Sequence, residues 1–339
     1  MLVNRASLEG EPGNMKLASL RNDSRDGELV VVSRDLKRMT RVADIAPTMQ
    51  AALDDWQQMR PRLLACYDKL ENGEDRGEPF SESAAHSPLP RAYQWCDGGT
   101  YPAHKERMRP GQAIPEWFAR ETSMYQGCSD GFLAPTGDIV HADEAWGIDY
   151  EAEIAVITDD VPYGITEAEA GKHIALVMLV NDVSLRNLTR NELDKGFGFV
   201  HSKPLSSFSP VAVTPDELGA AWSDYRLHGR VRSFVNGALR GDPDAGEATF
   251  GFEHLVAYCA KTRALGPGTI IGGGTVANHD RERGTSCIAE RRAIEKNDFG
   301  EAQTAFLAFG DRVRIEMLDA HGDSIFGAID QRVVQLAAR

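Results

Sequence analysis

Apolar residues recur along this chain in short runs, and the length and spacing of these runs predict a mostly β structure. Two β-like runs at residues 16–20 and 28–33 flank a polar turn, which predicts a hairpin. The remaining candidate strands share the same pattern of short apolar runs bounded by Gly, Pro or Asp, and they lie at 150–157, 208–213, 227–235, 269–272, 311–318 and 324–329.

Helical spacing is limited to a few segments. Apolar side chains in residues 48–70 recur three and four positions apart, which predicts a helix that Pro61 should kink or split near Arg60. A second helix is expected to begin at Thr166, because a residue able to cap a helix precedes Glu-Ala-Glu-Ala there. Residues 252–260 predict a third short helix. The fold class is therefore mixed, mostly β (α+β).

A polar stretch rich in Glu, Gly and Ser at residues 71–88 marks the expected boundary between two parts of the chain. We interpret residues 1–14 as a flexible extension or tag, with Met15 as a natural start. Residues 15–90 are then a small N-terminal lobe, and residues 91–339 form the catalytic domain. A length of 339 residues is enough for both.

Two acids stand inside the candidate strand at 150–157. Alternate strand residues share a face, so Glu151 and Glu153 are expected to point the same way, and two adjacent like charges need a cation. Asp182 follows the apolar run 174–180, where an unpaired carboxylate would be costly. Three hard oxygen ligands favour Mg²⁺, Ca²⁺ or Mn²⁺ over zinc.

Composition narrows the class of partner. The net charge of −14 argues against nucleic acid or an anionic membrane as partner. Five scattered cysteines without a CxxC pair indicate neither a disulfide framework nor a zinc site, which favours a reducing cytoplasm. No apolar run approaches the roughly 18 to 20 residues of a membrane span. Because of the net negative charge, an anionic substrate would need its own metal or Arg or Lys site.

Three further segments add candidate chemistry. Asp97 supplies a fourth carboxylate, and His104 lies seven residues later in what is expected to be a glycine-containing loop, where a histidine can act as a general base. Lys203 precedes a proline and could present a cation to an oxyanion. The triple glycine at 272–274 satisfies neither phosphate-binding motif, so nucleotide binding is rejected.

Taken in order, these motifs resemble the fumarylacetoacetate hydrolase (fumarylacetoacetase) family over nearly the whole chain from Met15. The matching motifs are Asp97 with His104, Glu151-x-Glu153, Asn181-Asp182-x-Ser184-x-Arg186, Lys203, and Gly274-Thr275 with Glu290. The resemblance implies a fumarylacetoacetase-like β-sandwich roll with a small N-terminal lobe, assembled as a homodimer.

The resemblance also implies roles for single residues. His104 is the general base, and Glu290 orients it, with Glu106 as a second candidate for that task. Arg186 and Lys203 stabilise the oxyanion. The metal ligands are Asp97, Glu151, Glu153 and Asp182, and the substrate-contact positions are Tyr125 and Thr275.

The chemistry implied is metal-dependent hydrolysis of a carbon–carbon bond in a β-diketo acid. The metal would chelate the diketone oxygens and stabilise the enolate that leaves, while His104 deprotonates the attacking water. The substrate expected first is fumarylacetoacetate, cleaved to fumarate and acetoacetate in the catabolism of tyrosine and other aromatic compounds.

Two positions depart from the family pattern and keep alternatives open. Thr189 and Leu193 stand where fumarylacetoacetases carry a glutamine and a tyrosine, which weakens the substrate assignment more than the reaction class. Rival enzymes on the same scaffold are fumarylpyruvate or acylpyruvate hydrolase, oxaloacetate decarboxylase, and 2-oxo-enoate hydratase or isomerase. A different class is a non-catalytic, metal-stabilised binding protein. A third class, a non-haem iron enzyme, would need two histidines and one carboxylate as ligands, which this carboxylate-rich set does not supply.

Overall fold

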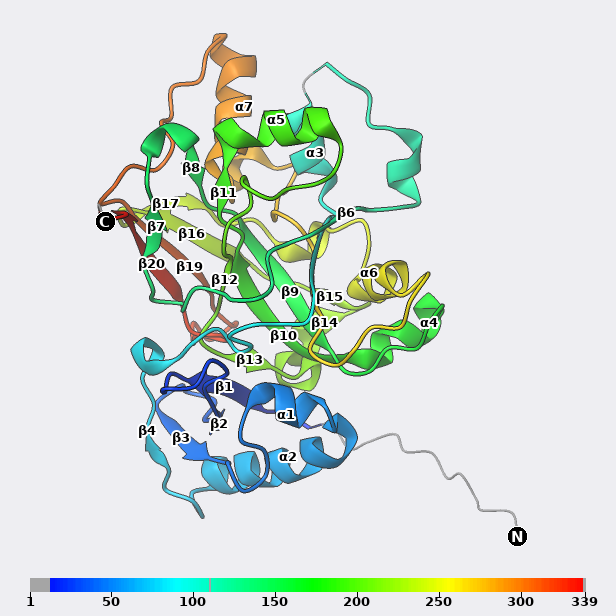
Figure 1. Ribbon diagram of the computed structural model, residues 1–339, viewed down its shortest axis with the longest axis vertical. Coiled ribbons are helices and arrows are strands. Elements are labelled where there is room, and N and C mark those ends of the chain that lie inside the picture. Colours follow the sequence, from blue (N-terminus) through cyan, green and yellow to red (C-terminus); the bar gives the residue numbers. More distant parts are fainter. Residues whose placement is uncertain (1–12, 110, 338–339) are drawn as a thin grey trace.

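The structure, a computed structural model, describes residues 13–109 and 111–337 (Figure 1). Within these residues most strands belong to two sheets. Strands of the larger sheet follow in the order β4 (Glu78–Pro79), β3 (Arg38–Arg41), β2 (Glu28–Val32), β1 (Lys16–Leu20), β13 (Ala212–Val213), β10 (Ile174–Asn181), β9 (Ala152–Thr158), β18 (Ile270–Gly272), β5 (Trp95–Gly99) and β6 (Ser123–Gln126), with β12 (Ser207–Phe208) paired to β10.

The smaller sheet packs against the middle of the larger one. Its strands follow in the order β17 (Ala238–Gly241), β16 (Val231–Val235), β19 (Arg312–Met317), β20 (Ile329–Gln335) and β7 (Ile139–His141). Strand β16 contacts β9, and β19 and β20 contact β10. Two short pairs complete the β structure, namely β8 (Ile148–Asp149) with β11 (Ser184–Leu185), and β14 (Trp222–Ser223) with β15 (Arg226–Leu227).

The predicted N-terminal hairpin is confirmed. Strands β1 and β2 pair antiparallel from Lys16 opposite Val32 to Leu20 opposite Glu28. Strand β1 also pairs with β13, so the N-terminal strands continue the larger sheet. Helices α1 (Met49–Leu53) and α2 (Trp56–Asn72) belong to the same small N-terminal part of the molecule, at the bottom of Figure 1. The predicted mostly-β, α+β fold with a small N-terminal lobe is therefore confirmed.

The predicted break at Pro61 is wrong. The helical region divides earlier, at residues 54–55, and Pro61 lies inside α2. Proline removes one backbone N–H from a helix, but Pro61 is exposed and its ring does not disturb the packed face. Burial of Leu63, Tyr67 and Leu70 on that face carries the helix past it.

Most of the other predicted strands occur. Strands β9, β18 and β19 match three of them, whereas the stretches at 208–213 and 227–235 are each divided between two shorter strands. The strand predicted at 324–329 is wrong, because β20 begins only at Ile329. Gly327 interrupts the stretch with a φ of +72°, and a Cβ there would lie 2.4 Å from Cγ of Pro210.

Two predicted helices are confirmed and three others carry no clear apolar pattern. The confirmed helices are α4 (Glu167–Ala170), a single turn, and α6 (Phe252–Cys259). The others are α3 (Pro102–Met108), α5 (Arg186–Lys195) and α7 (Ile288–Phe299). The buried residues of α5 and α7 include glutamates and few large apolar side chains, so hydrophobic periodicity could not reveal these helices.

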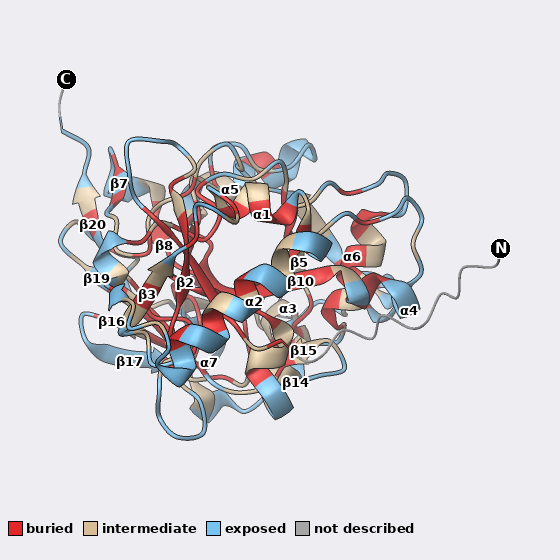
Figure 2. Cartoon of the chain, turned by 90° about the horizontal axis from the view of Figure 1, so that it is seen from below, coloured by how far each residue is buried: buried red, intermediate tan, exposed pale blue. Residues whose placement is uncertain are grey.

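Strands β9 and β10 form the buried centre of the molecule, and every residue of both is buried. Figure 2 shows buried strands surrounded by helices with exposed outer faces. Ile154 and Val156 face one apolar cluster, and the alternate residues Ala155 and Ile157 face the other. The backbone of these strands is therefore rigidly held, which matters because the acids follow the same alternation.

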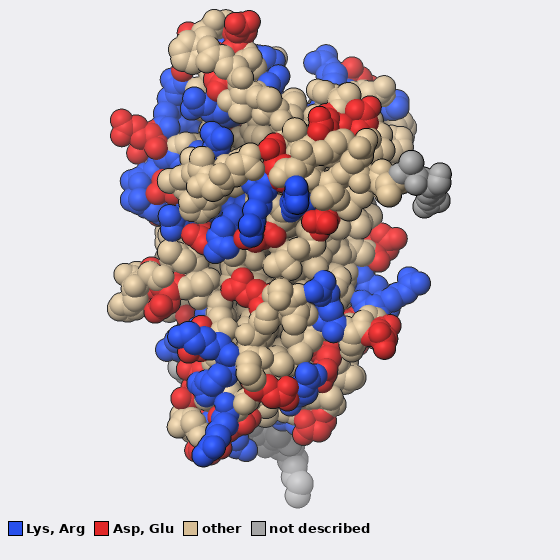
Figure 3. Space-filling view, turned by 90° about the vertical axis from the view of Figure 1, so that its left-hand side faces the viewer, with Lys and Arg blue, Asp and Glu red and all other residues tan. Residues whose placement is uncertain are grey.

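The described surface is mixed in charge, and Figure 3 shows Lys and Arg interspersed with Asp and Glu on one face. No helix among the described residues is long and apolar enough to cross a membrane. The proposed extension at 1–14 falls mostly on residues 1–12, which lie outside the described residues.

Candidate active site

The two glutamates of the acidic strand lie on one face of the sheet, as predicted. Glu153 lies within β9 and Glu151 just before it, and both are buried. They continue the face of Ala155 and Ile157, while Tyr150 packs with the apolar cluster on the other side.

Asp182 and Asp97 reach the same place from the neighbouring strands. Val180 of β10 lies opposite Glu153, so Asp182 emerges where β10 ends. Asp97 lies on β5, opposite Gly272 of β18. A Cβ at Gly272 would lie 2.3 Å from Oδ1 of Asp97, so only glycine leaves room for this carboxylate.

Asp97, Glu153 and Asp182 form a compact set of oxygen ligands. One carboxylate oxygen from each lies within 4.8 Å of the others. Burial, reinforced by the neighbouring carboxylates, raises the pKa of Asp97 and of Glu153 well above the usual values. Oε2 of Glu153 is buried without a hydrogen-bond partner, which is unusual for a polar atom in a protein interior.

Glu151 is held differently, by two cations. Arg186 donates from Nη2 to Oε1 of Glu151 at 2.7 Å, and Lys203 donates to Oε2. Burial opposes ionisation of Glu151, but the charges of Arg186 and Lys203 hold its pKa well below the usual value. Lys203 also donates to Oδ2 of Asp182, so it bridges two of the four acids.

Asp149 is a further acid of this network, and the sequence pattern did not assign it a role. It accepts from Nε of Arg186 at 2.8 Å and from the backbone N–H groups of Ile288 and Ala289 at 2.8 and 2.9 Å. These N–H groups open helix α7, where a carboxylate is favourable. Asp149 therefore fixes the start of α7 relative to Arg186.

The residues present fit a divalent cation. Asp97, Glu151, Glu153 and Asp182 bring four negative charges when ionised, and Lys203 and Arg186 bring two positive charges in return. The remaining charge, the unpartnered oxygen of Glu153 and the all-oxygen ligand set are what a hard ion such as Mg²⁺, Ca²⁺ or Mn²⁺ needs.

The loop predicted at His104 is wrong, because Pro102 opens helix α3 there and His104 lies within that helix. His104 and Glu290 are brought together by α3 and α7, although 186 residues separate them in the chain. Nδ1 of His104 lies 2.6 Å from Oε2 of Glu290, which is fully buried. A carboxylate can only accept here, so Nδ1 carries the proton and Nε2 is free to accept one. The electrostatic influence of His104 extends to Glu151, whose pKa it helps to lower.

Arg107 also binds Glu290, and this role was not predicted from the sequence. It lies one helical turn after His104, and its Nη1 lies 2.6 Å from Oε1 of Glu290. Burial opposes ionisation of Glu290, but its contacts with His104 and Arg107 lower its pKa below the usual value. Glu106, the other candidate for orienting His104, instead lies 3.5 Å from Nε2 of His279 on the surface.

The two proposed substrate-contact residues face the acids. Tyr125 donates its hydroxyl to Oδ2 of Asp182 at 2.5 Å, and Thr275 donates to Oε1 of Glu153 at 3.2 Å. Thr189 bonds back to the carbonyl of Leu185 within α5, and Leu193 is 58% exposed. The glutamine and tyrosine that the family pattern places at these two positions are therefore replaced here by a hydroxyl engaged within its own helix and an exposed apolar side chain.

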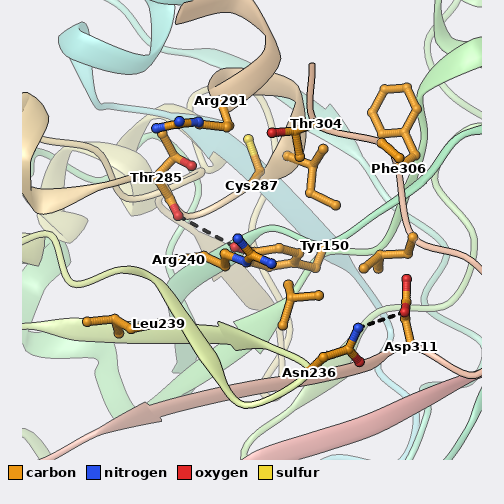
Figure 4. A pocket seen from close by; sticks show the side chains of 14 residues that line it. Tyr150, Asn236, Leu239, Arg240, Thr285, Cys287, Arg291, Thr304, Phe306 and Asp311 are labelled. Atoms are coloured by element: carbon orange, nitrogen blue, oxygen red, sulfur yellow. Dashed lines mark hydrogen bonds between the residues drawn. The ribbon is translucent and has the colours of Figure 1, made fainter. Parts of the chain in front are cut away.

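A cavity of about 400 Å³ lies apart from the acids, beside the start of α7 (Figure 4). Tyr150 and Cys287 line it, together with Arg240 and Arg291. None of the four clustered acids lines this cavity. The chemistry of the site is therefore that of the acids and His104.

Comparison with known proteins identifies the family. Residues 94–334 match the model of the fumarylacetoacetate (FAA) hydrolase C-terminal domain, and residues 15–91 match fumarylacetoacetase N-terminal domain 2. Among curated proteins, the chain is 28% identical over 220 residues to oxaloacetate tautomerase YisK of Bacillus subtilis (strain 168), covering 63% of this chain and 69% of that protein.

Solved structures share the fold. Fumarylacetoacetate hydrolase from Exiguobacterium antarcticum superposes with a TM-score of 0.68 at 18% identity, and maleylpyruvate hydrolase from Sphingobium sp. SYK-6, in complex with manganese (II) ion and pyruvate, with a TM-score of 0.65 at 15% identity. Each comparison covers 95% of this chain and 100% of the other. The chain belongs to the fumarylacetoacetate hydrolase family.

Proposed function

We propose that this protein is a divalent-metal-dependent hydrolase that cleaves a carbon–carbon bond in a β-diketo acid, with fumarylacetoacetate as the first candidate substrate. The observation that carries this proposal is the pairing of the partly buried His104 with the fully buried Glu290, close enough to the acids for His104 to lower the pKa of Glu151. A base held in one tautomer by a buried carboxylate is the arrangement that activates a nucleophile.

The cation would be held by Asp97, Glu153 and Asp182, with Glu151 as a fourth candidate. When bound, it would polarise the diketone oxygens and stabilise the enolate that forms on cleavage. The Mn²⁺ and pyruvate named for the maleylpyruvate hydrolase structure are consistent with this ligand set. Mg²⁺, Ca²⁺ and Mn²⁺ all suit these oxygen ligands.

His104 would take a proton from water at Nε2, while Glu290 holds the proton on Nδ1 and stabilises the imidazolium. The resulting hydroxide adds to a carbonyl carbon. The carbon–carbon bond then breaks, its electron pair leaves as an enolate, and the enolate accepts a proton. The products are a carboxylic acid and a keto acid.

Lys203 retains one N–H group that could donate to the alkoxide oxygen of a tetrahedral intermediate. An ammonium has three N–H groups, and Glu151 and Asp182 occupy two of those of Lys203. Arg186 donates from Nε to Asp149 and from Nη2 to Glu151, which leaves Nη1 to donate elsewhere. Both cations therefore suit the stabilisation of an alkoxide at the tetrahedral stage.

Tautomerisation or decarboxylation of oxaloacetate is the second candidate, favoured by the 28% identity to an oxaloacetate tautomerase. Both reactions use an enolate but need no attacking water. The missing polar groups at Thr189 and Leu193 also fit a change of substrate.

The test is a panel of fumarylacetoacetate, fumarylpyruvate, acetylpyruvate and oxaloacetate, each with Mg²⁺ or Mn²⁺ and with EDTA. We expect metal-dependent loss of diketone absorbance with release of two acids, and His104→Ala should lower kcat by roughly 10²- to 10⁴-fold. His321→Ala, in an exposed turn, is the matched control. Consumption of oxaloacetate alone would move the assignment to the second candidate.

A further inference from the structure

Lys105 differs from the other cations near the acids because no carboxylate pairs with it among the described residues. Lys203, Arg186 and Arg107 each form ion pairs with buried acids. The ammonium of Lys105 instead lies 3.0 Å from the hydroxyl oxygen of Ser123. A cation without an anionic partner is conspicuous in a chain of net charge −14.

Aromatic rings surround this ammonium on one side. It lies 3.4 Å from the ring centre of Phe118 and 5.3 Å from that of Trp117. Such contacts hold an ammonium in place but leave its charge uncompensated. Burial and the nearby positive charge of Arg109 lower the pKa of Lys105 to about 8. The local potential therefore favours an anion.

The pairing of β5 and β6 places this cation relative to the acids. Asp97 lies opposite Tyr125, and Gly99 lies opposite Ser123, two residues further along both strands. Alternate residues share a face, so Ser123 is on the face where Tyr125 reaches Asp182. Two residues of strand correspond to about 7 Å. The ammonium of Lys105 therefore lies along the same face, beyond the acids.

Gly99 leaves room for the side chains of Ser123 and Lys105. A Cβ at this position would lie 2.9 Å from the hydroxyl of Ser123 and 3.1 Å from Cε of Lys105. An anionic end of the substrate would thus find its cation on the side of α3.

We propose that Lys105 binds a carboxylate at the far end of the substrate, so that the enzyme prefers diketo acids that carry a second carboxylate distal to the diketone. The substrate preference in this inference rests on the proposed function. The contact between Lys105 and a carboxylate does not depend on it. It makes Lys105 a specificity-determining residue: the acids hold the diketone end, and Lys105 selects the length and charge of the other end.

The test compares metal-loaded wild type, Lys105→Met and Lys105→Arg on fumarylpyruvate, which has the distal carboxylate, and acetylpyruvate, which ends in a methyl group. Loss of a charge-assisted contact should lower kcat/KM of Lys105→Met for fumarylpyruvate by roughly 10- to 100-fold, chiefly through KM. Acetylpyruvate should change by less than about 2-fold, because it makes no such contact. Lys105→Arg should recover part of the loss. Lys69→Met, at an exposed position of α2, is the matched control.

Equal loss for both substrates, or no loss for either, would overturn the role of Lys105. If wild type turns over neither of these substrates nor fumarylacetoacetate, the proposed function fails, and titration calorimetry with fumarate as the probe still decides the binding contact. Weaker fumarate binding by Lys105→Met than by wild type and Lys69→Met supports the contact, and unchanged binding overturns it.

Discussion

His104 and Arg107, one turn apart on α3, hold opposite oxygens of the same buried carboxylate, that of Glu290. Arg107 also donates from Nη2 to the carbonyl of Asn278 at 2.6 Å. The guanidinium thus ties α3 to α7 and to the segment before His279. Its position suggests that it sets where Glu290 can place the imidazole.

Arg107→Gln should therefore lower kcat by roughly 10- to 100-fold, less than loss of the general base itself, with little change in KM. Arg107→Lys should recover part of the activity, because it restores the charge but not the two-point contact. Steady-state kinetics together with melting temperatures would check this. A change confined to KM, or equal losses for the two variants, would contradict a positioning role.

Glu153→Gln tests the cation site through stability instead of turnover. In EDTA the variant should melt at a higher temperature than wild type, because burial and the neighbouring carboxylates raise the pKa of Glu153, and the amide removes this unfavourable ionisable group. Added Mg²⁺ or Mn²⁺ should stabilise wild type by about 2.7 kcal/mol at a hundredfold excess over Kd, and the variant much less. Equal stabilisation of both proteins would count against Glu153 as a ligand.

Gly272→Ala should displace Asp97. The new Cβ would lie 2.3 Å from Oδ1 of Asp97 and 2.5 Å from the ring of Trp95, so we expect a loss of roughly 1 to 3 kcal/mol in unfolding free energy and weaker metal binding. Gly266→Ala is the control, because nothing lies within 4 Å of the added carbon. Chemical denaturation with and without metal would compare them, and similar behaviour of both variants would refute the packing argument.

Glu192 should make stability depend on pH. Its carboxylate accepts from the backbone N–H groups of Val200, His201 and Ser202, in the segment that leads to Lys203. Burial opposes its ionisation, but these bonds and the hydroxyl of Ser202 lower the pKa of Glu192 to about 2. A lowered folded-state pKa stabilises the protein above the unfolded pKa of roughly 4.5, and this contribution is lost as pH falls toward 2.

We expect Glu192→Gln to lose about 2 kcal/mol of unfolding free energy at pH 7, and the difference from wild type to shrink between pH 4.5 and 2. Urea denaturation at several pH values would measure it. Exposed Glu301→Gln should show no such difference. A gap that stays constant down to pH 2 would disprove the assignment.

Local patterns revealed the strands and the acids, because strand alternation and apolar runs are local properties. Glu151 and Glu153 could be placed on one face from their spacing alone. Arg107 and Asp149 could not, since their significance depends on α7, a helix without an apolar stripe. A charged residue one helical turn after His104 was the available signal for Arg107. The role of Lys105 could not be predicted either, because it depends on the absence of a carboxylate partner for its ammonium among the described residues.

The sheet that carries the acids also passes through the N-terminal strands, since β1 pairs with β13 and β13 with β10. The two segments that match separate family models are thus joined by backbone hydrogen bonds. Without residues 15–91, β13 would lose one of its two partner strands and leave unpaired N–H and C=O groups on an outer strand. The small lobe therefore acts as a protective cover against edge-to-edge association, and we expect both segments to fold as a single cooperative unit.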